Sequence, residues 1–159
     1  MEDILKIVIA DDNKLIADMI KNKIEDDKRC KVVGIANDEE SEMLLIDKLK
    51  PNLVITDLRK KNGWTGINII EKYQYCEYKP TFFIISASIV DYIETIRKLE
   101  IQYYLSKPYN EYDLMRIIND IYNDIYPKAI IELNNNIIKN DNRSFWNMII
   151  EKFKRIGQY

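Results

Sequence analysis

The sequence contains no histidine, and this absence excludes several classes of chemistry. A Ser-His-Asp hydrolase, a histidine-ligated metal site and a phosphohistidine carrier all need an imidazole ring. Cysteine is scarce as well: Cys30 and Cys76 are too few and too isolated for a disulfide framework or a zinc site. We expect both to be buried free thiols.

Membrane and targeting features are also missing from the sequence. No apolar run approaches the length of a membrane span, and the start, Met1-Glu2-Asp3, has the wrong charge for a signal peptide. A cytoplasmic protein is the expectation. The formal charge of −2 gives no general attraction to nucleic acid or to membranes. With 159 residues, 47% of them hydrophobic, the chain can form one globular domain and a short appendage.

Short apolar runs, rich in β-branched residues, alternate with segments of helical spacing. The predicted strands are residues 6–10, 31–36, 53–56, 81–86 and 103–106. The intervening helical stripes include Leu15, Ile16, Met19, Ile20 and Ile24, and also Leu114, Ile117, Ile118, Ile121 and Ile125. Asp38 and Asp91 are candidate N-caps. Five successive βα units predict an α/β fold, a parallel sheet with helices on both faces.

Polar residues stand where the predicted strands end. Asp11 and Asp12 follow the first strand, and Asp57 follows the third; Ser86 ends the fourth strand and Lys107 follows the fifth. Because the carboxyl ends of parallel strands meet at one edge, where ligands of such sheets bind, we expect these side chains to gather there.

The residue types at this edge suit phosphoryl transfer. Three carboxylates favour a hard cation such as Mg²⁺, and a carboxylate like that of Asp57 can be a nucleophile toward phosphorus. Lys107 would neutralise charge, and the Ser86 hydroxyl would donate to a phosphoryl oxygen. Each residue also has an ordinary interpretation: Asp12 as a helix N-cap, Ser86 as a strand-end hydroxyl and Lys107 as a solvated turn lysine.

The combined pattern resembles the receiver domain of two-component response regulators. It consists of Asp11-Asp12, Asp57, Ser86-Ala87 and Lys107-Pro108, in order at successive strand ends, over roughly residues 4–126. The resemblance implies a flavodoxin-like sheet of strand order 2-1-3-4-5. This order rests on the family likeness alone, because the spacing of the sequence does not fix which strands are neighbours. A phosphatase of the haloacid-dehalogenase type is disfavoured, because Asp11-Asp12-Asn13 lacks its Asp-x-Asp spacing.

The resemblance also implies roles for single residues. Asp57 matches the phosphoacceptor, and Asp11, Asp12 and the backbone carbonyl of Arg59 match Mg²⁺ ligands beside it. Ser86 and Lys107 match the pair that engages the phosphoryl group, and Tyr104, three residues before Lys107, matches the aromatic switch residue. The implied partner is a histidine kinase or a phosphotransfer protein. The chain would then not be an enzyme, beyond promoting phosphorylation and dephosphorylation of its own Asp57.

One loop departs from the family pattern. After Asp57 the chain has Lys60-Lys61 where relatives have a Met-Pro pair, and Gly66 arrives one position late. Arg59 and Ser88 occupy positions that tune phosphate hydrolysis in relatives, so the phosphate lifetime is open. A pseudo-receiver, an interaction module that never takes phosphate, is therefore the first alternative.

The end of the chain exceeds a minimal receiver. We divide the sequence into a receiver domain, residues 1–126, and a C-terminal helical hairpin, residues 127–159, with a break at residues 140–143. The hairpin is a candidate for homodimerisation or docking, for the start of a longer output region, or for DNA contact through Lys152, Lys154 and Arg155. Folding back on the receiver is an equally good interpretation.

Overall fold

The computed structural model describes residues 3–59 and 65–127. The chain divides into two units, Met1–Tyr122 and Asn123–Tyr159, and the fold described below is that of the first. Residues 128–159 of the predicted hairpin and the Lys60-Lys61 pair lie outside the described residues.

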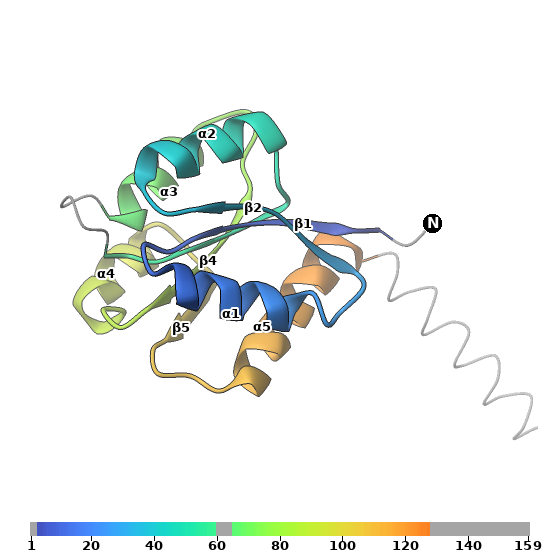
Figure 1. Cartoon of the computed structure of the whole chain (residues 1–159). Coiled ribbons are helices and arrows are strands. Elements are labelled where there is room, and N and C mark those ends of the chain that lie inside the picture. Colours follow the sequence, from blue (N-terminus) through green and yellow to red (C-terminus); the bar gives the residue numbers. More distant parts are fainter. Residues whose placement is uncertain (1–2, 60–64, 128–159) are drawn as a thin grey trace, which may run out of the picture. The chain divides into compact units, whose positions relative to one another are not determined.

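Strands and helices alternate along the first unit (Figure 1). The strands are β1 (Leu5–Ala10), β2 (Cys30–Ala36), β3 (Leu53–Thr56), β4 (Thr81–Ser86) and β5 (Tyr103–Ser106). The helices are α1 (Lys14–Ile24), α2 (Glu39–Leu49), α3 (Gly66–Gln74), a 3-10 turn η1 (Val90–Tyr92), α4 (Ile93–Lys98) and α5 (Glu111–Ile125). The last three residues of α5 belong to the second unit. The five predicted strands are confirmed, with β1 and β2 each beginning one residue earlier than predicted.

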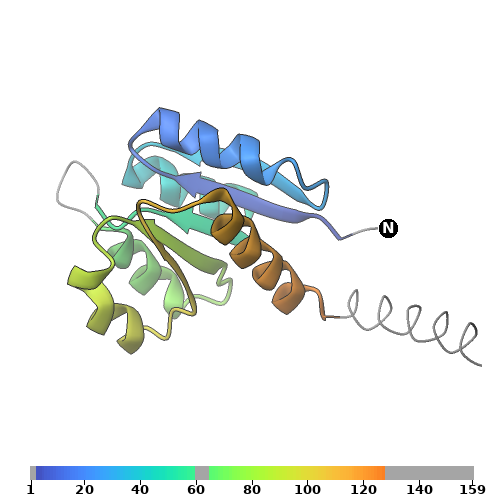
Figure 2. The same ribbon diagram turned by 90° about the horizontal axis from the view of Figure 1, so that it is seen from below.

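The strands form one parallel sheet in the order β2-β1-β3-β4-β5, which confirms the predicted fold class. Helices α1 and α5 lie on one face of the sheet, and α2, α3 and α4 lie on the other (Figures 1 and 2). Because side chains alternate along a strand, Val8, Val54 and Ile84 pack in one cluster with Ile46 of α2 and Ile96 of α4. The alternate residues of the same strands, such as Ile7, Ile55 and Phe83, are equally buried.

Burial on both faces explains why the central strands are nearly all apolar. The residues of β3 are buried throughout, as are those of β4 after its first residue. Such a strand has no face left for solvent, so polar groups appear only after its last residue. None of the described helices is long and apolar enough to cross a membrane.

Two sequence expectations about the helices are wrong. In α1 the buried side chains are those of Ala17, Ile20 and Ile24, whereas Leu15 and Met19 are exposed. At 100° per residue, positions 15 and 19 lie on the opposite side of the helix from position 17. Asp91 caps no helix, because it lies inside η1, whereas Asp38 does cap α2, through a hydrogen bond from the backbone N–H of Ser41.

The two thiols differ in environment, so the expectation that both are buried is wrong for one of them. Cys30 is buried, and burial raises the pKa of its thiol to about 11. Cys76 is exposed after α3, where its thiol donates to the backbone carbonyl of Lys72.

This difference predicts selective thiol modification. At pH 8 we expect a disulfide reagent to modify Cys76 readily and Cys30 at least about a hundredfold more slowly, because Cys30 forms little thiolate and is shielded. Mass spectrometry of timed samples measures both rates, and in denaturant both thiols should react alike. Equal rates in the folded protein would contradict the placement of Cys30.

Candidate functional site

The carboxyl ends of four strands bring the predicted polar residues together. Asp11 follows β1, Asp57 follows β3, Ser86 ends β4 and Lys107 follows β5. Backbone hydrogen bonds continue the sheet into these positions: Asp57 N–H donates to the Ala10 carbonyl (3.0 Å), and Lys107 N–H donates to the Ser86 carbonyl (3.0 Å). The Lys107-Pro108 peptide bond is cis. The sheet therefore fixes the starting point of each functional side chain.

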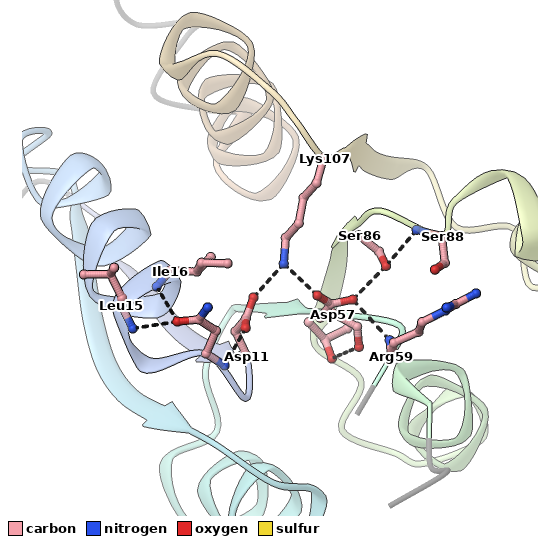
Figure 3. A network of polar contacts seen from close by, with 10 residues as sticks. Asp11, Leu15, Ile16, Asp57, Arg59, Ser86, Ser88 and Lys107 are labelled. Atoms are coloured by element: carbon pink, nitrogen blue, oxygen red, sulfur yellow. Dashed lines mark hydrogen bonds and ion pairs between the residues drawn. The ribbon is translucent and has the colours of Figure 1, made fainter. Parts of the chain in front are cut away.

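Lys107 lies between two carboxylates (Figure 3). Its Nζ donates to Oδ2 of Asp57 at 2.6 Å and to Oδ2 of Asp11 at 2.8 Å. The side chains of Lys107, Asp11 and Asp57 are 18%, 5% and 13% exposed, so all three charges are largely removed from water. The ammonium group offsets part of the charge of two acids that would otherwise repel each other more strongly.

The pKa of Lys107 follows from this arrangement. Burial opposes the charged form, but the hydrogen bonds and charges of Asp11 and Asp57 outweigh that effect, so the pKa of Lys107 is raised above its ordinary value. The lysine is therefore a permanent cation of the site at neutral pH.

The other oxygen of Asp57 receives two further donors. Ser86 Oγ donates to Asp57 Oδ1 at 2.7 Å, and the backbone N–H of Arg59 donates to the same oxygen at 3.1 Å. The backbone N–H of Ser88 donates to Ser86 Oγ at 3.2 Å, which leaves the hydroxyl proton directed at Asp57. Asp57 is thus held through both of its oxygens (Figure 3).

Asp11 is oriented by the start of α1. Its Oδ1 accepts from the backbone N–H of Asn13 at 2.8 Å, which leaves Oδ2 for Lys107. Asn13 is the N-cap of α1, accepting from the backbone N–H groups of Leu15 and Ile16. The interpretation of Asp12 as the cap is therefore wrong. Asp12, between Asp11 and Asn13 in the sequence, is half-buried. Its role in metal binding stays a prediction.

The carboxylates of this edge fit a hard cation. Asp11 and Asp57 already share one cation, the Lys107 ammonium, through oxygens that both face it. Carboxylate oxygens are the donors that Mg²⁺ prefers, and Mg²⁺ is usually held by only one or two of them. Among the described residues, however, no group of three or more acidic, cysteine or histidine side chains is arranged to hold a metal ion. The site therefore fits Mg²⁺ through Asp11 and Asp57, and Asp12 and the Arg59 carbonyl stay predictions.

Tyr104 lies on β5, one strand away from Ser86 of β4. It pairs in register with Ile84, two residues before Ser86, so it shares the sheet face of Ile84 and Ser86. Tyr104 is 43% exposed, on the strand at the edge of the sheet. The register places Tyr104 on the side where a switch residue would act, and that role stays a prediction.

The two ends of the loop after Asp57 contact each other. Arg59 and Thr65 form an isolated antiparallel bridge, and Gly66 N–H donates to the Leu58 carbonyl at 3.2 Å. A Cβ on Gly66 would lie 2.6 Å from the backbone oxygen of Asp57 and 3.0 Å from Oγ1 of Thr56. Glycine is required at position 66 because the backbone of Asp57 passes directly beside it.

Replacing Gly66 by alanine is therefore expected to destabilise the protein by about 2 kcal/mol, since backbone atoms must move to admit the methyl group. Gly34→Ala is the matched control. Its Cβ would meet mainly the ends of Leu45 and Leu49 side chains, at 3.0–3.3 Å, which can shift at a smaller cost. Urea unfolding of the two variants measures the difference, and equal losses would contradict the crowding at Gly66.

Two contacts in and next to the site could not be predicted from the sequence. The Ser88 backbone N–H orients Ser86, and no side-chain pattern reveals a backbone donor. The guanidinium group of Arg59 pairs with Asp91 on η1, Nη2 to Oδ2 at 3.0 Å, across a gap of 32 residues in sequence. No spacing rule could have paired these residues, because the pairing depends on the tertiary fold.

Comparisons with known proteins identify the family. The family model of the response regulator receiver domain matches residues 7–119. The chain is 27% identical over 145 residues to a protein-glutamate methylesterase/protein-glutamine glutaminase of Syntrophomonas wolfei, covering 86% of this chain and 40% of that protein. It is 26% identical over 109 residues to the sensory transduction protein LytT of Bacillus anthracis, covering 67% and 43%. The chain thus spans less than half the length of these relatives.

Solved structures show the same fold. The receiver domain of AraT from Geobacillus stearothermophilus gives a TM-score of 0.70 at 20% identity, covering 79% of this chain and 98% of that one. The response regulator domain of CheB from Thermotoga maritima gives 0.64 at 19% identity, covering 75% and 94%.

Proposed function

The chain belongs to the response regulator receiver domain family, and from this membership we propose that it is a cytoplasmic signalling switch phosphorylated on Asp57. The donor is a histidine kinase or a phosphotransfer protein, as receiver domains of two-component signalling imply in general. We assign this function to the receiver domain, residues 1–126.

One observation carries the proposal: donors converge on the carboxylate of Asp57. Lys107 Nζ, Ser86 Oγ and the Arg59 backbone N–H all bond to it, within 3.1 Å. Phosphoryl transfer requires positioning and neutralisation of negative charge more than acid–base catalysis. These three donors support the proposal, because they could stabilise the negative charge of a phosphoryl group on Asp57.

The reaction is an in-line displacement at phosphorus. An oxygen of Asp57 forms the new P–O bond while the P–N bond of the donor phosphohistidine breaks, and the bonding electron pair stays with the imidazole ring. Lys107 neutralises part of the charge that gathers on the phosphoryl oxygens, and the Ser86 hydroxyl donates a hydrogen bond to one of them. Hydrolysis of the acyl phosphate later returns the carboxylate and releases inorganic phosphate.

Receiver domains typically bind Mg²⁺, and Asp11 and Asp57 are the side chains that would hold it here, with Asp12 and the backbone carbonyl of Arg59 as further proposed ligands. When bound, Mg²⁺ supplies charge neutralisation between the carboxylates and the phosphoryl oxygens.

Phosphorylation changes the charge of Asp57 from −1 to about −2 and adds strong acceptor oxygens. Ser86 and Lys107 would follow these oxygens, and Tyr104, on the same sheet face as Ser86, would turn with them. A difference of a few kcal/mol between the two states is enough for such a switch.

Incubation with acetyl phosphate and Mg²⁺, followed by intact-mass measurement, tests the proposal. We expect the mass of one added phosphoryl group, and no addition when EDTA removes the metal. A chain that stays unmodified while a known receiver is phosphorylated in the same buffer would contradict it. That outcome would favour the pseudo-receiver, a module that binds partners without taking phosphate.

Other roles stay outside this proposal. DNA binding or homodimerisation through residues 127–159 falls almost wholly outside the described residues. The methylesterase and glutaminase activities belong to relatives of which this chain spans 40% or less, and the receiver fold gives no reason to assign them here.

A further inference from the structure

The backbone of Arg59 contacts the site, whereas its side chain points away from the site. Its N–H donates to Asp57 Oδ1, while its guanidinium group lies against Asp91 of η1. In Figure 3 the side chain points away from Asp57. A cationic side chain two residues after Asp57 is thus paired with a carboxylate outside the site.

The pair that holds Arg59 is weak and easily exchanged. The side chains of Arg59 and Asp91 are 69% and 60% exposed, and pairs of this exposure are stabilised only slightly over the separated ions. An arginine side chain has several rotatable bonds, so a stronger anion nearby can attract it at a small cost.

Phosphorylation would create such an anion. Lys107 is already divided between Asp11 and Asp57, so it neutralises an added phosphoryl charge only in part. A guanidinium group can pair with phosphoryl oxygens in a planar, bidentate geometry, and the phosphoryl charge near −2 attracts it more strongly than the single charge of an exposed carboxylate does.

We propose that Arg59 exchanges partners: it pairs with Asp91 when Asp57 is a free carboxylate and with the phosphoryl group when Asp57 is phosphorylated. Asp91 is then a competitor that holds the arginine away from the site. Its release would couple phosphorylation to η1, which begins two residues after Ser88. The inference rests on the proposed function of Asp57.

The exchange predicts opposite effects of breaking one ion pair from its two ends. In Arg59→Gln the phosphoryl group loses a cation, whereas in Asp91→Asn the arginine loses its competitor. We expect the affinity for beryllium trifluoride, a stable mimic of the phosphoryl group, to fall about two- to fivefold in Arg59→Gln and to rise by a similar factor in Asp91→Asn. A pair that is only a structural tie would shift both variants in the same direction.

Calorimetric titration with beryllium trifluoride at saturating Mg²⁺ measures these affinities in the full chain. The double variant supplies the cycle: without Arg59, Asp91→Asn should bring no gain. Arg59→Lys should keep part of the affinity, because it keeps the charge but not the planar fork. Thermal unfolding of each variant shows whether a loss of folding contributes. Because both single variants break the same ion pair, a loss of stability alone would affect the two alike.

The outcomes separate the two proposals. Shifts of the same sign, or no shift beyond error, in a chain that binds beryllium trifluoride would overturn the exchange and leave Asp57 as the phosphoacceptor. A wild-type chain that neither binds the mimic nor takes phosphate from acetyl phosphate would overturn both.

Discussion

Asp57→Asn is expected to abolish phosphorylation by acetyl phosphate, because an amide oxygen is too weak a nucleophile toward phosphorus. The variant should still fold. Asparagine keeps an oxygen that can accept from Ser86 and from the Arg59 backbone N–H, and Lys107 keeps Asp11 as its partner. Intact-mass measurement after incubation with Mg²⁺ should show no phosphoryl adduct.

Asp18→Asn is the matched control for this substitution. Asp18 is 42% exposed and pairs with Lys14 on the surface of α1, so its replacement removes one negative charge without touching the site. It should be phosphorylated as wild type is. An adduct of equal yield in Asp57→Asn would transfer the acceptor role to another side chain and refute the assignment.

Lys107→Ala is expected to produce the largest loss of stability, about 2–3 kcal/mol at neutral pH. The two carboxylates that share the ammonium group are 5% and 13% exposed, and removal of the cation leaves them as uncompensated, mutually repelling charges. The raised pKa of Lys107 means that its stabilising effect is fully present below its ordinary pKa of 10.5. That effect is lost only as the pH rises through the higher, folded-state pKa.

Lys14→Ala provides the control, because the Lys14 side chain is 87% exposed in its pair with Asp18 and should contribute less than about 0.5 kcal/mol. Urea unfolding compares the two variants. Mg²⁺ should restore part of the stability of Lys107→Ala, since a divalent ion can replace the missing charge between the carboxylates. Equal losses in the two lysine variants would show that Lys107 is not bound as described.

The sheet could be predicted from sequence because each strand and each strand end carries its own signal. The run from Ile7 to Ala10 is apolar, and polar residues begin directly after it, at Asp11. The other apolar runs alternate along the chain with segments of helical spacing. Parallel topology then forces Asp11, Asp57, Ser86 and Lys107 to one edge. Strand order came from family resemblance, and the structure confirms it.

Interactions that depend on tertiary distances could not be predicted in this way. The apolar residues Leu15 and Met19 satisfy a helical spacing, yet the sheet covers only the other side of α1. Aspartate is a residue type that often caps helices, but in the fold Asp91 lies inside η1 and pairs with Arg59. Local sequence reports propensity, and the partner of a side chain is set by elements far away in the chain.

The most direct test of the central claim locates the phosphoryl group itself. Sodium borohydride reduces an aspartyl phosphate to homoserine, and the change stays in the peptide through proteolysis. After treatment with acetyl phosphate and Mg²⁺, peptide mass spectrometry should find homoserine at position 57 and unmodified aspartate at positions 11, 12 and 91. Homoserine at any other position, with aspartate intact at 57, would contradict the account.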